Sequence, residues 1–119
     1  MNETEVRQIY LHSFETHFFI SLKTSLQFYD KLGQPYPLRL YVALTGVKGF
    51  AARPSRYSFL DETHLVDRDQ LLFDPILING RDDDIEKSLQ SLLNQLWNAG
   101  GYPRSLSYDE NGLWDSRAS

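Results

Sequence analysis

The 119-residue chain contains no cysteine. It therefore has no disulfide framework, no thiolate zinc site and no cysteine nucleophile. Its three histidines, His12, His17 and His64, limit metal ligation and general-base chemistry. His12 and His17 are separated by about 140° around a helix, so they cannot converge on a metal as an i, i+4 pair would. We expect no catalytic residue, no metal site and no cofactor.

Long apolar runs are also missing. No stretch approaches the about 20 apolar residues that cross a bilayer. The first residues, Met1 to Arg7, carry acids rather than the basic start of a secretory signal. We therefore expect a cytoplasmic protein without a membrane partner. With 41% hydrophobic and 24% charged residues, the composition is that of a single globular domain over residues 1–119.

Acidic residues are absent from residues 31–60, although the formal net charge is −4. The next stretch, 61–86, is in contrast rich in aspartate and glutamate. Such asymmetry arises when strands of opposite charge pair within one sheet. It also arises when a basic face binds nucleic acid. In that second interpretation the basic stretch 39–56 contacts phosphates through Lys48, Arg53 and Arg56.

The first secondary-structure signal predicts a long helix over residues 4–32. Apolar residues recur with i, i+4 spacing from Tyr10 to Leu26, and no glycine or proline intervenes before Gly33. On the helical wheel His12 falls on the polar face, opposite the main apolar stripe. A second, thinner apolar edge would remain uncovered by a single sheet, and it indicates a homodimer interface formed by Val6, Ile9 and Ile20.

Three further stretches have strand character. Residues 38–45 alternate between apolar and other side chains, and residues 50–52 resume a strand after Gly46-Val47-Lys48-Gly49. That tetrapeptide lacks the spacing of a phosphate-binding loop, so we interpret it as a bend. Tyr57–Phe59 predicts the start of another strand, and residues 70–78 predict a strand with an irregularity at Pro75.

A second helix is expected after the acidic run Asp82-Asp83-Asp84. Clustered carboxylates also suit magnesium, but one of these aspartates is well placed to cap the helix and complement its dipole. Gly100 or Gly101 would end the helix. The order of elements predicts an α+β fold: an antiparallel sheet of three or four strands, with the long N-terminal helix and the C-terminal helix packed mainly on one face.

The C-terminal stretch is rich in large aromatic residues. Disordered tails are poor in such residues, because burying them is favourable. We therefore expect residues 102–119 to dock onto the domain as a tail. Its Asp109-Glu110-Asn111-Gly112 segment predicts a tight turn.

Two segments at this end carry a resemblance to a known family. They are Leu96-Trp97-Asn98-Ala99-Gly100-Gly101 and Tyr108-Asp109-Glu110-Asn111-Gly112-Leu113-Trp114. Together with the preceding pattern they resemble the C-terminal module of bacterial proteins that begin with an Alba-like, Schlafen-type DNA-binding domain. No part of this chain corresponds to the DNA-binding half. The resemblance thus implies an accessory or oligomerising domain in a DNA-linked regulatory or defence system, and it assigns no catalytic residue.

The sequence leads to two hypotheses about function. The first is a non-catalytic interaction or oligomerisation module whose partner is a second copy of the chain or another protein. The alternative is a nucleic-acid-binding domain that uses the basic stretch 39–56. The small number of cations and the acidic balance of the whole chain weigh against this alternative.

Overall fold

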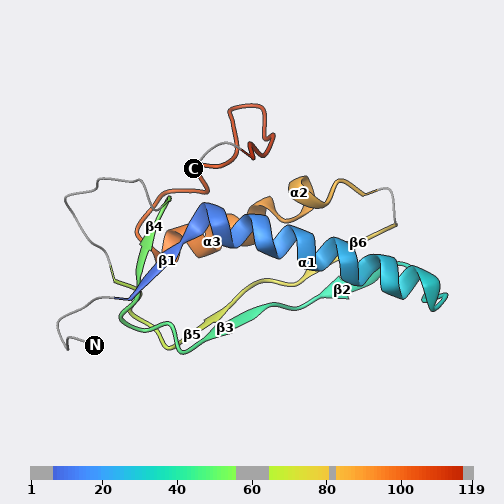
Figure 1. Cartoon of the computed structure of the whole chain (residues 1–119), viewed down its shortest axis with the longest axis horizontal. Coiled ribbons are helices and arrows are strands. Elements are labelled where there is room, and N and C mark those ends of the chain that lie inside the picture. The colour runs from blue at the N-terminus through green and yellow to red at the C-terminus, as the bar shows by residue number, and fades with distance from the viewer. Residues whose placement is uncertain (1–6, 56–64, 81–82, 117–119) are drawn as a thin grey trace.

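The computed structural model describes residues 7–55, 65–80 and 83–116. One long helix, α1 (Leu11–Lys31), runs along the molecule. In Figure 1 a long β-ribbon lies below α1. The C-terminal segment, residues 102–116, lies on the other side of α1, above it in the same view. Helix α3 (Gln90–Ala99) lies beside the N-terminal half of α1. Helices are combined with strand pairs that are mainly antiparallel, and the predicted α+β class is confirmed.

Helix α1 begins at Leu11, not at residue 4 as the periodicity predicted. The described residues just before it form strand β1 (Gln8–Tyr10), which pairs in parallel with β4 (Ala51–Arg53). Tyr10 is extended, with φ −89° and ψ 103°. The backbone N–H of His12 donates to the Pro54 carbonyl at 3.1 Å. The prediction was wrong here because a ladder with a distant strand takes the backbone groups that another helical turn would have used.

The β-ribbon consists of two antiparallel ladders placed end to end. Strand β2 (Leu38–Leu40) pairs with β6 (Ile76–Ile78), and β3 (Ala43–Thr45) pairs with β5 (Gln70–Leu72). Between the ladders, residues 41–42 on one side face residues 73–75 on the other. The extra residue forms a bulge that includes Pro75, as expected for a residue that cannot donate to a ladder.

The strands of the described residues do not join into one sheet. They form three two-stranded ladders, of which β1–β4 is parallel and the two ladders of the ribbon are antiparallel. The sequence pattern predicted one antiparallel sheet of three or four strands. The bulge shifts the register between the ribbon ladders by one residue and divides the ribbon. The strand expected to begin at Tyr57 lies outside the described residues.

The acidic run caps a helix, as predicted. Asp84 is the N-cap of α2 (Ile85–Ser88), and its side chain accepts from the Lys87 N–H at 3.2 Å. Leu89 joins α2 to α3, whose inner face buries four apolar residues. Gly100 is the C-cap of α3. The buried residues on that face are Leu92, Leu93, Leu96 and Trp97.

The hydrophobic core lies between the two long helices, the ribbon and the C-terminal segment. Helix α1 contributes Leu11 and Phe19, and the ribbon contributes Leu71 and Ile78. Tyr108 enters the same cluster from the C-terminal segment. The ribbon therefore covers one side of the core, and the C-terminal segment covers another.

Gly100 sits where a side chain has no room. A Cβ atom built there would lie 2.5 Å from the Cβ of Ala52 on β4, which is buried. We expect Gly100→Ala to destabilise the protein by about 1–3 kcal/mol, because the inserted methyl group forces α3 and β4 apart. Urea unfolding measures the effect.

Two variants control this experiment. Gly80→Ala adds a methyl group where no atom lies within 4 Å and should change stability little. Adding Ala52→Gly to Gly100→Ala removes the clashing atom and should restore part of the loss. Equal stability of the Gly100→Ala and Gly80→Ala variants would contradict the close approach.

Candidate functional site

A carboxylate in the core is the main polar feature of the described residues. Glu15 on α1 has 0% of its surface exposed. Its Oε2 accepts from Trp97 Nε1 at 3.1 Å and from Ser105 Oγ at 2.7 Å. Its Oε1 accepts from Ser107 Oγ, and from Trp114 Nε1 at 3.3 Å. Four donors thus replace the water that a buried carboxylate loses.

The donors come from two parts of the chain that are distant from Glu15 in sequence. Trp97 is on α3, and the other three belong to the C-terminal segment, which we define as residues 102–116. A hydrogen bond that does not involve Glu15 also holds the backbone of this segment, since the Ser105 N–H donates to Asn94 Oδ1 at 2.8 Å. Arg104 Nη1 donates to the carbonyls of Ser105 and Tyr108, each at 2.9 Å.

His12 lies one helical turn before Glu15 and completes the cluster. Its Nδ1 is 3.0 Å from Ser107 Oγ and 3.8 Å from Glu15 Oε1, and its Nε2 is 3.1 Å from the Ser116 carbonyl oxygen. Only 4% of His12 is exposed, so its assignment to the polar face of the helix was wrong. At 100° per residue His12 lies only about 20° from Phe19, at the edge of the apolar stripe, and the C-terminal segment covers this edge.

Trp114 packs between two side chains of α1. Its ring stacks on the His12 imidazole, with centroids 5.1 Å apart and 11° between the planes. It meets Phe19 edge to face at 5.0 Å. Trp114 itself is half-buried. Because aromatic pairs contribute about 0.5–1.5 kcal/mol beyond their buried area, these contacts stabilise the docking of the segment.

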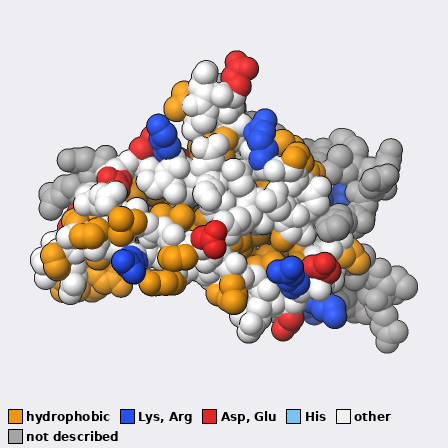
Figure 2. Space-filling model, turned by 180° about the vertical axis from the view of Figure 1, so that it is seen from behind, with side chains coloured by type: hydrophobic (Ala, Val, Ile, Leu, Met, Phe, Trp, Pro, Cys, Tyr) orange, Lys and Arg blue, Asp and Glu red, His pale blue; other side chains and the backbone are white. Residues whose placement is uncertain are grey.

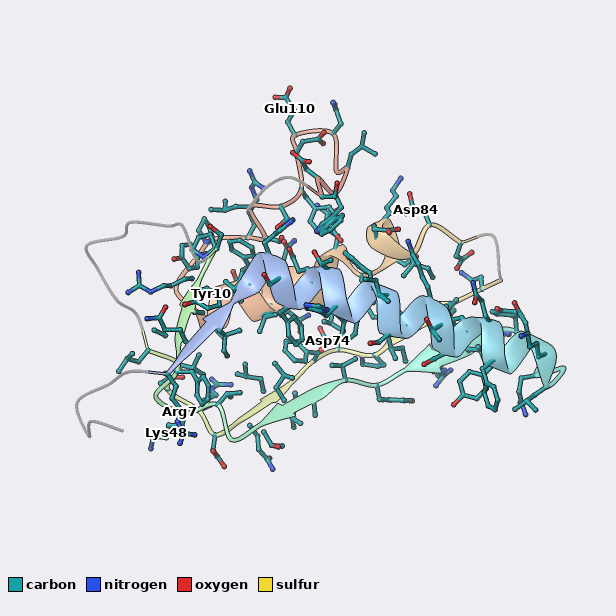
Figure 3. The ribbon with its side chains drawn as sticks, in the orientation of Figure 1. Arg7, Tyr10, Lys48, Asp74, Asp84 and Glu110 are labelled. Atoms are coloured by element: carbon teal, nitrogen blue, oxygen red, sulfur yellow. The ribbon has the colours of Figure 1, made fainter. Side chains whose placement is uncertain are left out.

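A tight turn brings Trp114 back to α1. Gly112 has φ 77°, and its N–H donates to the Asp109 carbonyl at 3.0 Å. The Asp109 carboxylate accepts from the N–H groups of Asn111 and Leu113. Tyr108 and Trp114 form an antiparallel bridge across this turn, and Glu110 projects from its tip (Figure 3). The predicted turn is therefore confirmed, with glycine in the left-handed region that disfavours other residues.

Tyr108 anchors the segment to α2. Its hydroxyl donates to the Glu86 carbonyl oxygen. Burial raises the pKa of Tyr108 well above its usual value of 10.0, and the charges of Glu15, Glu86 and Asp84 raise it further. The phenol therefore remains a neutral donor across the physiological pH range.

The arrangement of Ser107, His12 and Glu15 does not match a nucleophilic triad. In a triad the carboxylate orients the base, which accepts the proton of the nucleophile. Here the Ser107 hydroxyl donates to the carboxylate, and the second ring nitrogen faces a backbone carbonyl. Ser107 is also only 1% exposed, which leaves no room for a substrate. The cluster joins the C-terminal segment to α1 and offers no reactive centre.

Glu15, Ser105 and Ser107 were not identified from the sequence. Glu15 lies four residues after Leu11 and four before Phe19, so a carboxylate occupies a position within an apolar stripe. This position is the one signal that could have indicated a buried acid. The two serines lie in an irregular segment and carry no comparable signal.

The described residues include two of the three candidate nucleic-acid residues. Lys48 is exposed in the bend between Gly46 and Gly49, close to Arg7 in Figure 3. Arg7 itself lies over the Phe50 ring, 6.0 Å from its centroid. Arg53 is only partly exposed, and its Nε atom is buried with no hydrogen-bond partner among the described residues. The third candidate, Arg56, lies outside the described residues.

The candidate interface residues also differ in exposure. Ile20 is 60% exposed on α1. Ile9 is part of β1 and packs against the core. Val6 lies outside the described residues. The assignment of these three residues to an interface stays a prediction.

Two further kinds of site are absent from the described residues. No group of three or more His, Cys, Asp or Glu side chains there could hold a metal ion. No helix in the described part of the chain is long and apolar enough to cross a membrane. Comparison of the chain with protein-family models, curated proteins and solved structures gives no match.

Glu15 can be tested by replacing it with its uncharged isostere. In Glu15→Gln the amide NH₂ must face two of the four donors. We expect a loss of about 3–5 kcal/mol in the free energy of unfolding, since buried donors are left without an acceptor. Glu110→Gln, at an exposed position, is the matched control and should change stability by less than about 0.5 kcal/mol. Similar urea midpoints for both variants would show that the buried cluster does not stabilise the fold.

Proposed function

We propose that this protein is a non-catalytic interaction or oligomerisation module that associates with a second copy of itself. The observation that carries the proposal is the exposed apolar surface on the outer face of the ribbon. Leu72 is 76% exposed, Tyr41 68% and Leu77 46%. Leu72 on β5 and Leu77 on β6 follow each other along one arm of the ribbon, and Tyr41 lies between β2 and β3 on the other arm.

A second apolar region lies at the end of α1. Phe28 and Leu32 are more than half exposed, and Tyr29 is partly exposed beside them. In Figure 2 hydrophobic side chains gather at this end of the molecule, over the last turns of α1 and the adjoining part of the ribbon. Contiguous apolar surface of this kind marks association sites in soluble proteins.

The open edges of the ribbon support association between copies. Within residues 7–55, 65–80 and 83–116 each ribbon ladder has two strands, so each of these strands has one edge without a strand partner there. Such edges pair readily with another strand, and a two-fold axis lets the same edge serve both subunits. Arg39 is the single charged residue of β2 and β3, so little charge repulsion opposes the pairing.

The biological setting rests on the family resemblance. A self-associating domain of this kind would serve as the accessory or oligomerising part of a bacterial DNA-linked regulatory or defence system. The other candidate partner is a separate protein that docks on the same apolar surface. The buried and hydrogen-bonded state of Ser107, His12 and Glu15 supports a role without catalysis.

Self-association can be tested by charge insertion on the outer face. We expect the wild-type chain to be a dimer at tens of micromolar in analytical ultracentrifugation. Leu72→Glu with Leu77→Glu should shift it to monomer, because the charges cannot be buried in an apolar contact. Ile20→Glu tests whether α1 also contributes.

Gln70→Glu is the matched control, since Gln70 lies on the same ribbon and is already polar and exposed. It should leave the dimer intact. A wild-type chain that remains strictly monomeric at 100 µM would contradict the proposal.

The nucleic-acid alternative predicts that the isolated chain binds DNA or RNA, whereas we expect little binding. Lys48, Arg53 and Arg56 could release few counterions, and an acidic protein repels a polyanion. We expect dissociation constants weaker than about 10⁻⁴ to 10⁻⁶ M, measured by fluorescence anisotropy at about 150 mM salt. Tight, salt-sensitive binding that is abolished by Arg53→Glu with Arg56→Glu, but kept in Arg68→Glu, an exposed position outside the basic stretch, would favour the alternative.

A further inference from the structure

The hydrogen bonds around His12 define which of its nitrogens carry protons. The Ser116 carbonyl oxygen can only accept, so Nε2 must donate to it. The proton of the Ser107 hydroxyl is directed to Glu15, so the Ser107 oxygen accepts from Nδ1. Both ring nitrogens therefore donate, which is possible only for the imidazolium form.

The positive ring also lies beside the negative charge of Glu15. The distance from Nδ1 to Oε1 is 3.8 Å, and His12 forms the one ion pair made by Glu15 among the described residues. A buried carboxylate is stable when a counter-charge and donors surround it. Loss of the His12 proton removes the counter-charge and one of the two ring donors together.

We infer that His12 is a pH-sensitive latch that holds the end of the C-terminal segment on α1. With the ring protonated, Ser107, Trp114 and Ser116 are held together. When the ring is neutral, it can no longer donate to both oxygens, so either the Ser116 contact or the Ser107 contact to Glu15 is lost. The end of the segment then opens more often, and Phe19, which is now 3% exposed, becomes accessible where Trp114 covers it.

Other charged and titratable groups come from the elements packed around His12. Glu15 is on the same helix, and Tyr108 and Asp115 are in the C-terminal segment. Strand β4 contributes Arg53, next to the Pro54 carbonyl that accepts from the His12 backbone. Helix α3 has no charged residue. A variant of His12 itself therefore separates its effect from those of the other groups.

Amide exchange measured by NMR tests the latch. The Asp115 N–H donates to the Ser107 carbonyl at 2.7 Å and reports on the docked segment. Between pH 5.5 and pH 8.5 its protection factor should fall at least about tenfold. The protection factor already accounts for the change of the intrinsic exchange rate with pH. The Leu93 N–H, bonded to the Leu89 carbonyl in the helical core, should keep its protection and excludes global unfolding.

Two variants and one direct measurement complete the test. In His12→Gln the pH dependence of Asp115 protection should disappear, whereas in His17→Gln, which alters an exposed histidine on the same helix, it should remain. Nitrogen-15 spectra of the wild-type ring should show both nitrogens of His12 protonated at pH 5.5. A neutral His12 ring at that pH, or equal Asp115 protection at both pH values, would overturn the inference even if His12→Gln fails to fold.

Discussion

A carboxylate without access to water imposes a strict requirement on its surroundings, because every lost hydration contact must be replaced by a donor in the right place. Glu15 meets this requirement with two indoles and two hydroxyls. These donors arrive from α3 and from the C-terminal segment, so one group on α1 determines how both lie against it. A shift of the segment by one residue would remove the serine hydroxyls from the carboxylate. Glu15 thus specifies the register of an irregular segment that has no ladder of its own along α1.

Strand β4 provides the complementary connection on the apolar side. Its backbone pairs with β1, and the Pro54 carbonyl that follows it accepts from the first turn of α1. Ala52 meets the end of α3 at Gly100, where only a hydrogen atom fits. One short strand therefore contacts the start of one helix and the end of the other. The ribbon, in contrast, exposes the apolar side chains of Leu72 and Leu77 on its outer face.

Much of the fold follows from local pattern, and the remainder depends on long-range contacts. Alternation and i, i+4 spacing located the ribbon strands, the long helix and the cap at Asp84, because each is decided by residues close in sequence. The start of α1 was wrong, since a parallel ladder with β4 is not visible in the periodicity of residues 4–10. The polar cluster could not be derived either. Its members lie 82 to 99 residues from Glu15, and sequence spacing does not show which serine or tryptophan will reach an acid on a helix.

This long separation has a consequence for synthesis on the ribosome. Glu15 emerges early, yet Trp97, Ser105, Ser107 and Trp114 are all translated much later. During this interval α1 carries a charged side chain in the middle of its apolar stripe, which keeps that part of the helix hydrated and opposes its premature burial. Contacts between residues so far apart also form slowly, because the entropy of closing the intervening chain must be overcome first. The core can therefore be completed only after the C-terminal segment has emerged, because this segment carries Tyr108 and three of the four donors to Glu15.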